Sequence, residues 1–142
     1  LKDGTKKMSK SDLSDLSRIN LTDNKNDIIN KIKKAKTDPL PMPSNLEELE
    51  KRPEAKNLIG IYSSLMGLNL DQTVKNYSGK NFSEFKENLS QILVENIEPI
   101  SLEIQKLLND KSYLDEIILD GSHKASEIAS EKIKKIHEIL GF

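Results

Sequence analysis

PEAKNLIGIYSSLMG, residues 53–67, is the most informative stretch for the fold of this chain of 142 residues. Pro53 stands at a position that suits the first turn of a helix, and Gly67 stands where helices commonly end. Between them, apolar residues recur at the three- and four-residue spacing of one helix face. They are Ala55, Leu58, Ile59, Tyr62, Leu65 and Met66. The stretch therefore predicts a core helix with defined ends.

The same periodicity predicts helices on both sides of this stretch. Before it, Thr22 or Asp23 is expected to cap a helix that ends near Thr37. The apolar face of that helix comprises Ile28, Ile29, Ile32 and Ala35. After the central stretch, Asn69 is expected to cap a short helix that ends at Gly79.

The remainder of the chain also shows helical spacing. A long helical region begins near Phe82 and is expected to be kinked or interrupted at Pro99. Two further helical pieces follow, divided near Gly121. Because these stripes recur along the chain and no strand pattern is convincing, we predict an all-α fold built as an antiparallel helical bundle.

A proline-rich segment separates two parts of the chain. Pro39, Pro41 and Pro43 hold their backbone extended and lack donors for a helix. We therefore predict three parts: residues 1–37 with a loop and its following helix, residues 38–45 as a linker, and residues 46–142 as a helical domain.

Near its start the chain carries the run Lys7-Met8-Ser9-Lys10-Ser11. Two long ammonium side chains on a mobile loop can converge on a triphosphate, while small serines let the backbone approach it. The run favours a flexible phosphate-binding loop ahead of the bundle. A solvated tail that matches such a loop by chance is the alternative.

The net charge of −1 hides an asymmetry. Residues 1–36 hold ten Lys and Arg against five Asp and Glu, and the other residues hold twelve against eighteen. The local positive charge would attract ATP or an RNA backbone. The lysines at positions 31, 33, 34 and 36 are interpreted mostly as the solvated face of one helix.

Composition excludes several kinds of site. The chain has no cysteine, hence no disulfide framework, and no apolar run long enough to cross a membrane, so a soluble cytoplasmic protein is expected. His123 and His137 have no partner at metal-ligand spacing and are interpreted as structural, so no metal site is predicted.

Six stretches, residues 7–23, 32–38, 52–63, 77–86, 98–100 and 141–142, together resemble the bacterial tryptophanyl-tRNA synthetases. In that family the Lys-Met-Ser-Lys-Ser run is the signature loop of the class I enzymes. The resemblance spans nearly the whole chain. Leu13 departs from the family, which usually has proline at this position. Because leucine does not fix the backbone as proline does, the exit of the loop is expected to be less stiff here.

The resemblance implies that Lys7 and Lys10 are the catalytic cations, which stabilise the phosphates that leave ATP. It assigns the ATP site to Lys7, Met8, Ser9, Lys10 and Ser11. Mg²⁺ is expected on the ATP phosphates, without ligands from this chain.

For the whole protein, the resemblance implies activation of tryptophan with ATP, transfer to tRNA(Trp), and a homodimer held mostly by another part. The catalytic Rossmann-like domain is absent from this chain, which is expected to be a C-terminal portion that is inactive alone. Residues from about 45 onward are expected to bind the tRNA anticodon. The alternative is a noncatalytic helical interaction module with a basic N-terminal arm.

Overall fold

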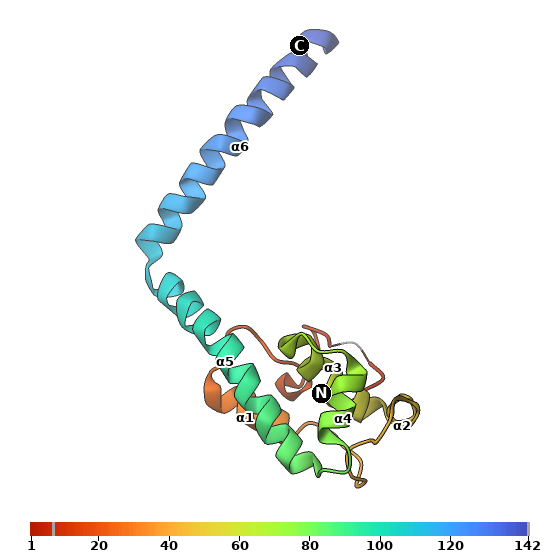
Figure 1. Cartoon of the computed structure of the whole chain (residues 1–142). Coiled ribbons are helices and arrows are strands. Elements are labelled where there is room, and N and C mark those ends of the chain that lie inside the picture. Colours follow the sequence, from red (N-terminus) through yellow and green to blue (C-terminus); the bar gives the residue numbers. More distant parts are fainter. Residues whose placement is uncertain (7, 142) are drawn as a thin grey trace. The chain divides into compact units, whose positions relative to one another are not determined.

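The computed structural model describes residues 1–6 and 8–141. These residues form helices and no strand, which confirms the predicted all-α fold class. The chain divides into two compact units, Leu1–Leu102 and Glu103–Phe142. In chain order the elements are the 3₁₀-helix η1 (Asp15–Ser17) and the helices α1 (Lys25–Lys33), α2 (Leu46–Glu50), α3 (Pro53–Met66), α4 (Leu70–Tyr77), α5 (Phe82–Asn109) and α6 (Lys111–Leu140) (Figure 1).

The core of the first unit lies between α1, α3, α4 and the first turns of α5. Three rings meet there, those of Tyr62, Tyr77 and Phe85, with ring centroids 4.8 to 5.6 Å apart. The Tyr77 hydroxyl donates to the Tyr62 hydroxyl over 3.1 Å and accepts a hydrogen bond from Asn88. Burial and the contact with Tyr77 raise the pKa of Tyr62 to about 12, so its hydroxyl stays protonated at neutral pH.

The predicted ends of the central helices are confirmed. Pro53 is the first residue of α3, and Gly67 follows it in the left-handed conformation with φ of 64°. Asn69 caps α4: its side chain accepts from the Gln72 backbone N–H over 2.8 Å, and the Gln72 side chain accepts from the Asn69 N–H over 3.0 Å. Local chemistry alone therefore specifies both ends of this turn between helices.

The start of α1 lies one or two residues later than expected. Asn24, and not Thr22 or Asp23, caps the helix by accepting from the backbone N–H groups of Asn26 and Asp27. The Asp23 carboxylate does not cap the helix, because it accepts a hydrogen bond from a buried lysine of α1. The predicted caps are therefore wrong, and a tertiary contact is the reason.

The helix α5 runs through Pro99, so the expected interruption there is wrong, whereas the expected kink stays a prediction. The predicted division near Gly121 is also wrong. The helix α6 runs through Gly121, which costs only about 1 kcal/mol relative to alanine. The ion pair between Asp120 and Lys124, 2.6 Å long, spans that glycine and supports the helix.

The proline-rich segment, residues 38–45, is fastened to the first unit at two points. The Met42 side chain is 2% exposed, and its backbone N–H donates to the Lys80 carbonyl over 2.8 Å. Arg52 donates to the Asp38 carboxylate from Nε over 2.9 Å and from Nη2 over 2.6 Å. The segment is therefore attached to the unit through Asp38 and Met42, while Leu40 between them is exposed.

The Arg52–Asp38 pair predicts a pH dependence of stability. Burial raises the pKa of Asp38, but the hydrogen bonds from Arg52 and the Leu40 N–H outweigh it, so the pKa lies below the usual value. Its ionisation therefore stabilises the fold fully above about pH 4, and this contribution is lost as pH falls through the lowered pKa.

Asp38→Asn should accordingly make the free energy of unfolding less dependent on pH below about pH 4. Urea unfolding followed by circular dichroism at several pH values measures this. Asp71→Asn is the matched control, because Asp71 pairs with Lys75 on the exposed face of α4. Parallel curves for the parent and Asp38→Asn would contradict the prediction.

The second unit consists of the end of α5 and α6. No described residue of α6 is buried, although an apolar stripe runs along it. Exposed members of that stripe include Ile117, Ile128, Ile133, Ile136 and Leu140. Among the described residues, no helix combines the length and the apolar character that crossing a membrane requires.

Candidate functional site

Residues 9–12, which include the end of the run predicted to bind phosphate, form a tight turn. The Asp12 N–H donates to the Ser9 carbonyl over 3.4 Å, so Lys10 and Ser11 take the two central positions. The hydroxyls of Ser9 and Ser11 lie 3.0 Å apart, and the Ser11 N–H donates to the Ser9 hydroxyl over 3.3 Å. The turn thus carries a lysine and two hydroxyl groups on one short, exposed piece of backbone.

Lys10 is exposed at the tip of this turn. No ion pair engages it within the part of the chain that the structure describes. Lys6, in contrast, lies 3.6 Å from the Asp3 carboxylate. Met8 is 39% exposed, and Lys7, the other predicted cation, lies outside the described residues. Among the described residues of the loop, Lys10 is therefore a cation whose charge is available to a ligand.

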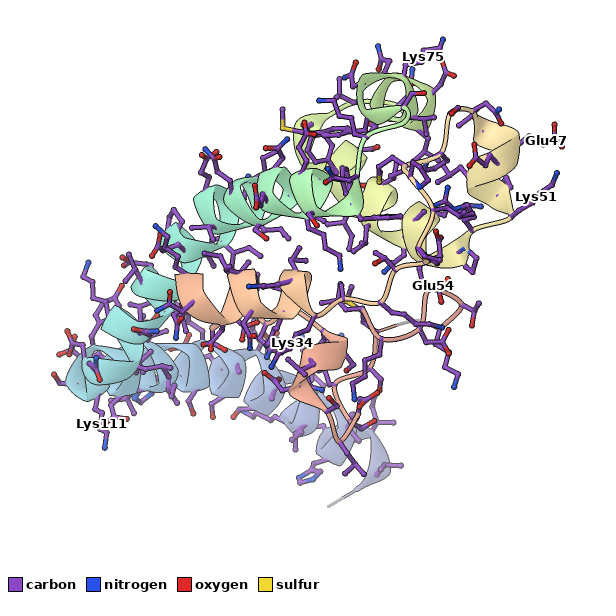
Figure 2. The ribbon with its side chains drawn as sticks, turned by 90° about the horizontal axis from the view of Figure 1, so that it is seen from below. Lys34, Glu47, Lys51, Glu54, Lys75 and Lys111 are labelled. Carbon is purple, nitrogen blue, oxygen red and sulfur yellow. The ribbon has the colours of Figure 1, made fainter. Side chains whose placement is uncertain are left out.

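The start of the loop packs against the first turn of α3. A Cβ atom at Gly4 would lie 2.6 Å from the backbone nitrogen of Glu54, closer than real contacts allow, so only glycine fits there. Lys36 Nζ is 2.8 Å from the Glu54 carboxylate, and this hydrogen bond holds the pKa of Glu54 below its usual value. Figure 2 shows Glu54 at the start of α3, beside the N-terminal segment. The loop and α3 are therefore in direct contact.

The end of the loop is held by Arg18, which the sequence pattern did not single out. Its Nη1 atom donates to the Ser9 carbonyl over 3.3 Å and to the Asp12 carbonyl over 3.1 Å. Its Nε atom donates to Asn20 over 3.2 Å, and Nη2 lies 3.2 Å from the Asp15 carboxylate. No motif marks such a residue, because its partners on the loop are backbone carbonyls.

Lys31 of α1 anchors this arrangement. Its Nζ atom lies 2.6 Å from both the Asp15 and the Asp23 carboxylates, and its side chain is 4% exposed. Burial lowers the pKa of Lys31, but the hydrogen bonds with the two carboxylates outweigh it and raise the pKa. The hydrogen bond from Lys31 also lowers the pKa of Asp15. Both groups are therefore charged at neutral pH.

The placement of Lys31 on a solvated helix face is thus wrong. The signal was present in the sequence, because Lys31 follows Ile28 by three residues and so falls within the buried stripe of α1. Lys33 and Lys34 are exposed, as expected. Figure 2 labels Lys34 at the end of α1.

A groove of about 990 Å³ lies between α1 and α5, away from the turn. Its walls include Ile29, Phe82 and Val94. Lys86 lies within it and donates to the Ala35 carbonyl over 2.6 Å at the end of α1, while burial lowers its pKa. None of the residues predicted to bind phosphate lines this groove.

The remaining polar candidates lie on α6. His123 and His137 are exposed, and residues 1–6 and 8–141 hold no group of three histidine or acidic side chains that suits a metal ion. Lys135 pairs with Glu131 over 2.6 Å on the same helix face. These side chains of α6 therefore do not form an alternative candidate site to the turn at residues 9–12.

The sequence of this chain is similar to those of known proteins. Residues 1–97 match the family model described as tRNA synthetases class I (W and Y). The tryptophan–tRNA ligase of Rickettsia conorii is 49% identical over 142 residues, which cover 100% of this chain and 42% of that protein. The ligase of Mesorhizobium japonicum is 46% identical over 141 residues, covering 99% of this chain and 40% of that protein. The chain thus spans about 40% of the length of the curated relatives it matches.

Proposed function

Because the chain belongs to the class I tRNA synthetases of the W and Y family, we propose that it supplies the ATP-phosphate loop and the tRNA-binding helices of a tryptophan–tRNA ligase. The observation that supports this most is the match of the whole chain to ligases of that name at 44% to 49% identity. Such an enzyme activates tryptophan with ATP and then transfers it to tRNA(Trp).

In the first step the tryptophan carboxylate attacks the α-phosphorus of ATP, the bond to the bridging oxygen breaks, and pyrophosphate leaves. Negative charge grows on the pyrophosphate as this bond breaks, so cations placed there lower the barrier. Lys10 and Lys7 take this role in the proposal. The exposed position of Lys10 suits it, while Lys7 lies outside the described residues.

The rest of the turn fits a triphosphate. Among the described residues, the hydroxyls of Ser9 and Ser11 pair with each other and with the local backbone, so both can turn to phosphate oxygens. Met8 completes the proposed ATP-binding run. Magnesium is held in this proposal by phosphate oxygens and water.

The three predicted parts of the chain have separate roles in this proposal. Residues 1–37 form the edge of the catalytic domain, residues 38–45 link it onward, and residues 46–142 bind tRNA(Trp). In this proposal the tryptophan pocket and most contacts of a homodimer belong to a part of the whole enzyme outside this chain. The chain alone is therefore expected to be inactive.

A chimera tests the proposal. In the Rickettsia conorii ligase, the matched 42% is replaced by this chain, and tryptophan-dependent exchange of labelled pyrophosphate into ATP is measured. We expect exchange within about tenfold of the intact ligase, a difference of only about 1.4 kcal/mol in the barrier. The ligase without its matched part is the negative control. A folded chimera without exchange would contradict the proposal and favour a noncatalytic helical module.

A further inference from the structure

We propose that Arg18 is a positioning residue for the phosphate loop: its guanidinium group holds the turn of residues 9–12 in the conformation that presents Lys10 to a triphosphate. The conformation of the turn can be tested in this chain by itself. Only the expected loss of reaction rate rests on the proposed function. In this proposal Arg18 acts through the turn and not on the substrate.

The contact of Arg18 with the turn supports this role. One nitrogen, Nη1, reaches the carbonyls of Ser9 and Asp12, which are the first and last residues of the turn. The turn's own closing hydrogen bond, from the Asp12 N–H to the Ser9 carbonyl, is long at 3.4 Å. A cation that binds both carbonyls therefore fixes a backbone that closes only weakly by itself.

The other edge of the guanidinium is fixed as well. Nε donates to Asn20, and Nη2 faces the Asp15 carboxylate. Asn20 is held in turn, since its side chain donates to Asp15 over 3.0 Å and its N–H donates to Asp23 over 2.8 Å. Arginine alone offers donors in this fork, so a lysine ammonium cannot reproduce the arrangement.

The network ends on a buried group in a regular helix. Lys31 of α1 binds both Asp15 and Asp23 over 2.6 Å, and its side chain is nearly fully buried. Its position is set by the packing of Ile28 and Ile32, which are 0% exposed. The rigid core of the first unit therefore sets the geometry of the loop through Lys31, Asp15 and Arg18.

Loss of the hydrogen bonds from Arg18 to the turn should misplace Lys10 without unfolding the first unit. A displacement of about 1 Å of a catalytic group costs roughly a hundredfold in rate. In the chimera, we expect Arg18→Ala to lower kcat for pyrophosphate exchange by about tenfold to a hundredfold, and Arg18→Lys to restore only part of it.

A double-mutant cycle separates positioning from general structure. If Arg18 acts by placing Lys10, Arg18→Ala should change the rate little, by less than about threefold, once Lys10→Ala is present. The matched control is Arg52→Ala, which removes a buried, ion-paired arginine distant in sequence from the loop. Its effect should be the same in both backgrounds. Equal losses for Arg18→Ala in both backgrounds, or no loss in either, would overturn the inference.

Hydrogen exchange of this chain gives a second readout that needs no activity. Arg18→Ala should speed exchange of the backbone amides of residues 9–14 and leave α1 and α3 protected. Arg52→Ala should act instead on residues 38–52. Unchanged exchange at residues 9–14, or faster exchange throughout the first unit, would overturn the inference. An inactive parent chimera would reject the proposed function alone and leave this readout to decide.

Discussion

Lys10→Ala in the chimera should lower tryptophan-dependent pyrophosphate exchange by about a hundredfold to a thousandfold. One well-placed donor on a developing negative charge contributes about 2.7–4 kcal/mol in comparable sites. Lys10 is exposed at the centre of a turn and is engaged by no ion pair in the described part of the chain, so its full charge is available to the departing phosphates. Initial rates at saturating ATP and tryptophan measure the loss in kcat.

Lys6→Ala is the matched control for this variant. Lys6 belongs to the same basic segment, but it is paired with Asp3 and lies before the proposed ATP-binding run. Its removal changes the net charge by the same amount, so general attraction of ATP is altered equally. A Lys10→Ala rate within about threefold of the parent, or an equal loss in both variants, would reject a specific role for Lys10.

Lys31→Met should destabilise the first unit by about 3–5 kcal/mol, because it leaves a buried carboxylate without its cation. The Asp23 side chain is 8% exposed and relies on Lys31 for its charge partner. Urea unfolding of this chain measures the loss. The near-ultraviolet circular dichroism of the buried Tyr62–Tyr77 pair reports on this unit.

Two further variants make the result specific. Lys34→Met removes an exposed lysine three residues later and should change stability by no more than about 0.5 kcal/mol. Lys31→Met combined with Asp23→Asn removes both charges and should be less harmful than Lys31→Met alone. A double variant that is less stable than Lys31→Met would show that side-chain packing, and not an unpaired charge, dominates.

The sequence predicted the helix ends that depend on local chemistry. Pro53, Gly67 and Asn69 act on their own backbone or on residues within one turn, so their effect can be read without knowing the fold. Pro99 and Gly121 do not end their helices, because each costs a limited free energy that the rest of a long helix outweighs. A residue that only weakens a helix does not mark its end.

The candidate site could be predicted only in its exposed part. The turn that carries Lys10 follows from a short motif, whereas Arg18 and Lys31 act through contacts that form when the loop folds onto α1. Every residue has a backbone carbonyl, so the sequence does not indicate which carbonyls of the loop accept hydrogen bonds from Arg18. For Lys31, charge alone indicates a solvated position, whereas helical register, three residues after Ile28, indicates a buried one.

The close approach of Gly4 to the start of α3 also bears on how such proteins can be recombined. Its backbone lies where no larger residue fits, and the Lys36–Glu54 pair lies alongside. A recombinant enzyme that takes the loop from one species and the helices from another must therefore inherit a compatible junction. Swaps divided within the proline-rich segment would disrupt this junction, while swaps that keep residues 1–54 together would preserve it.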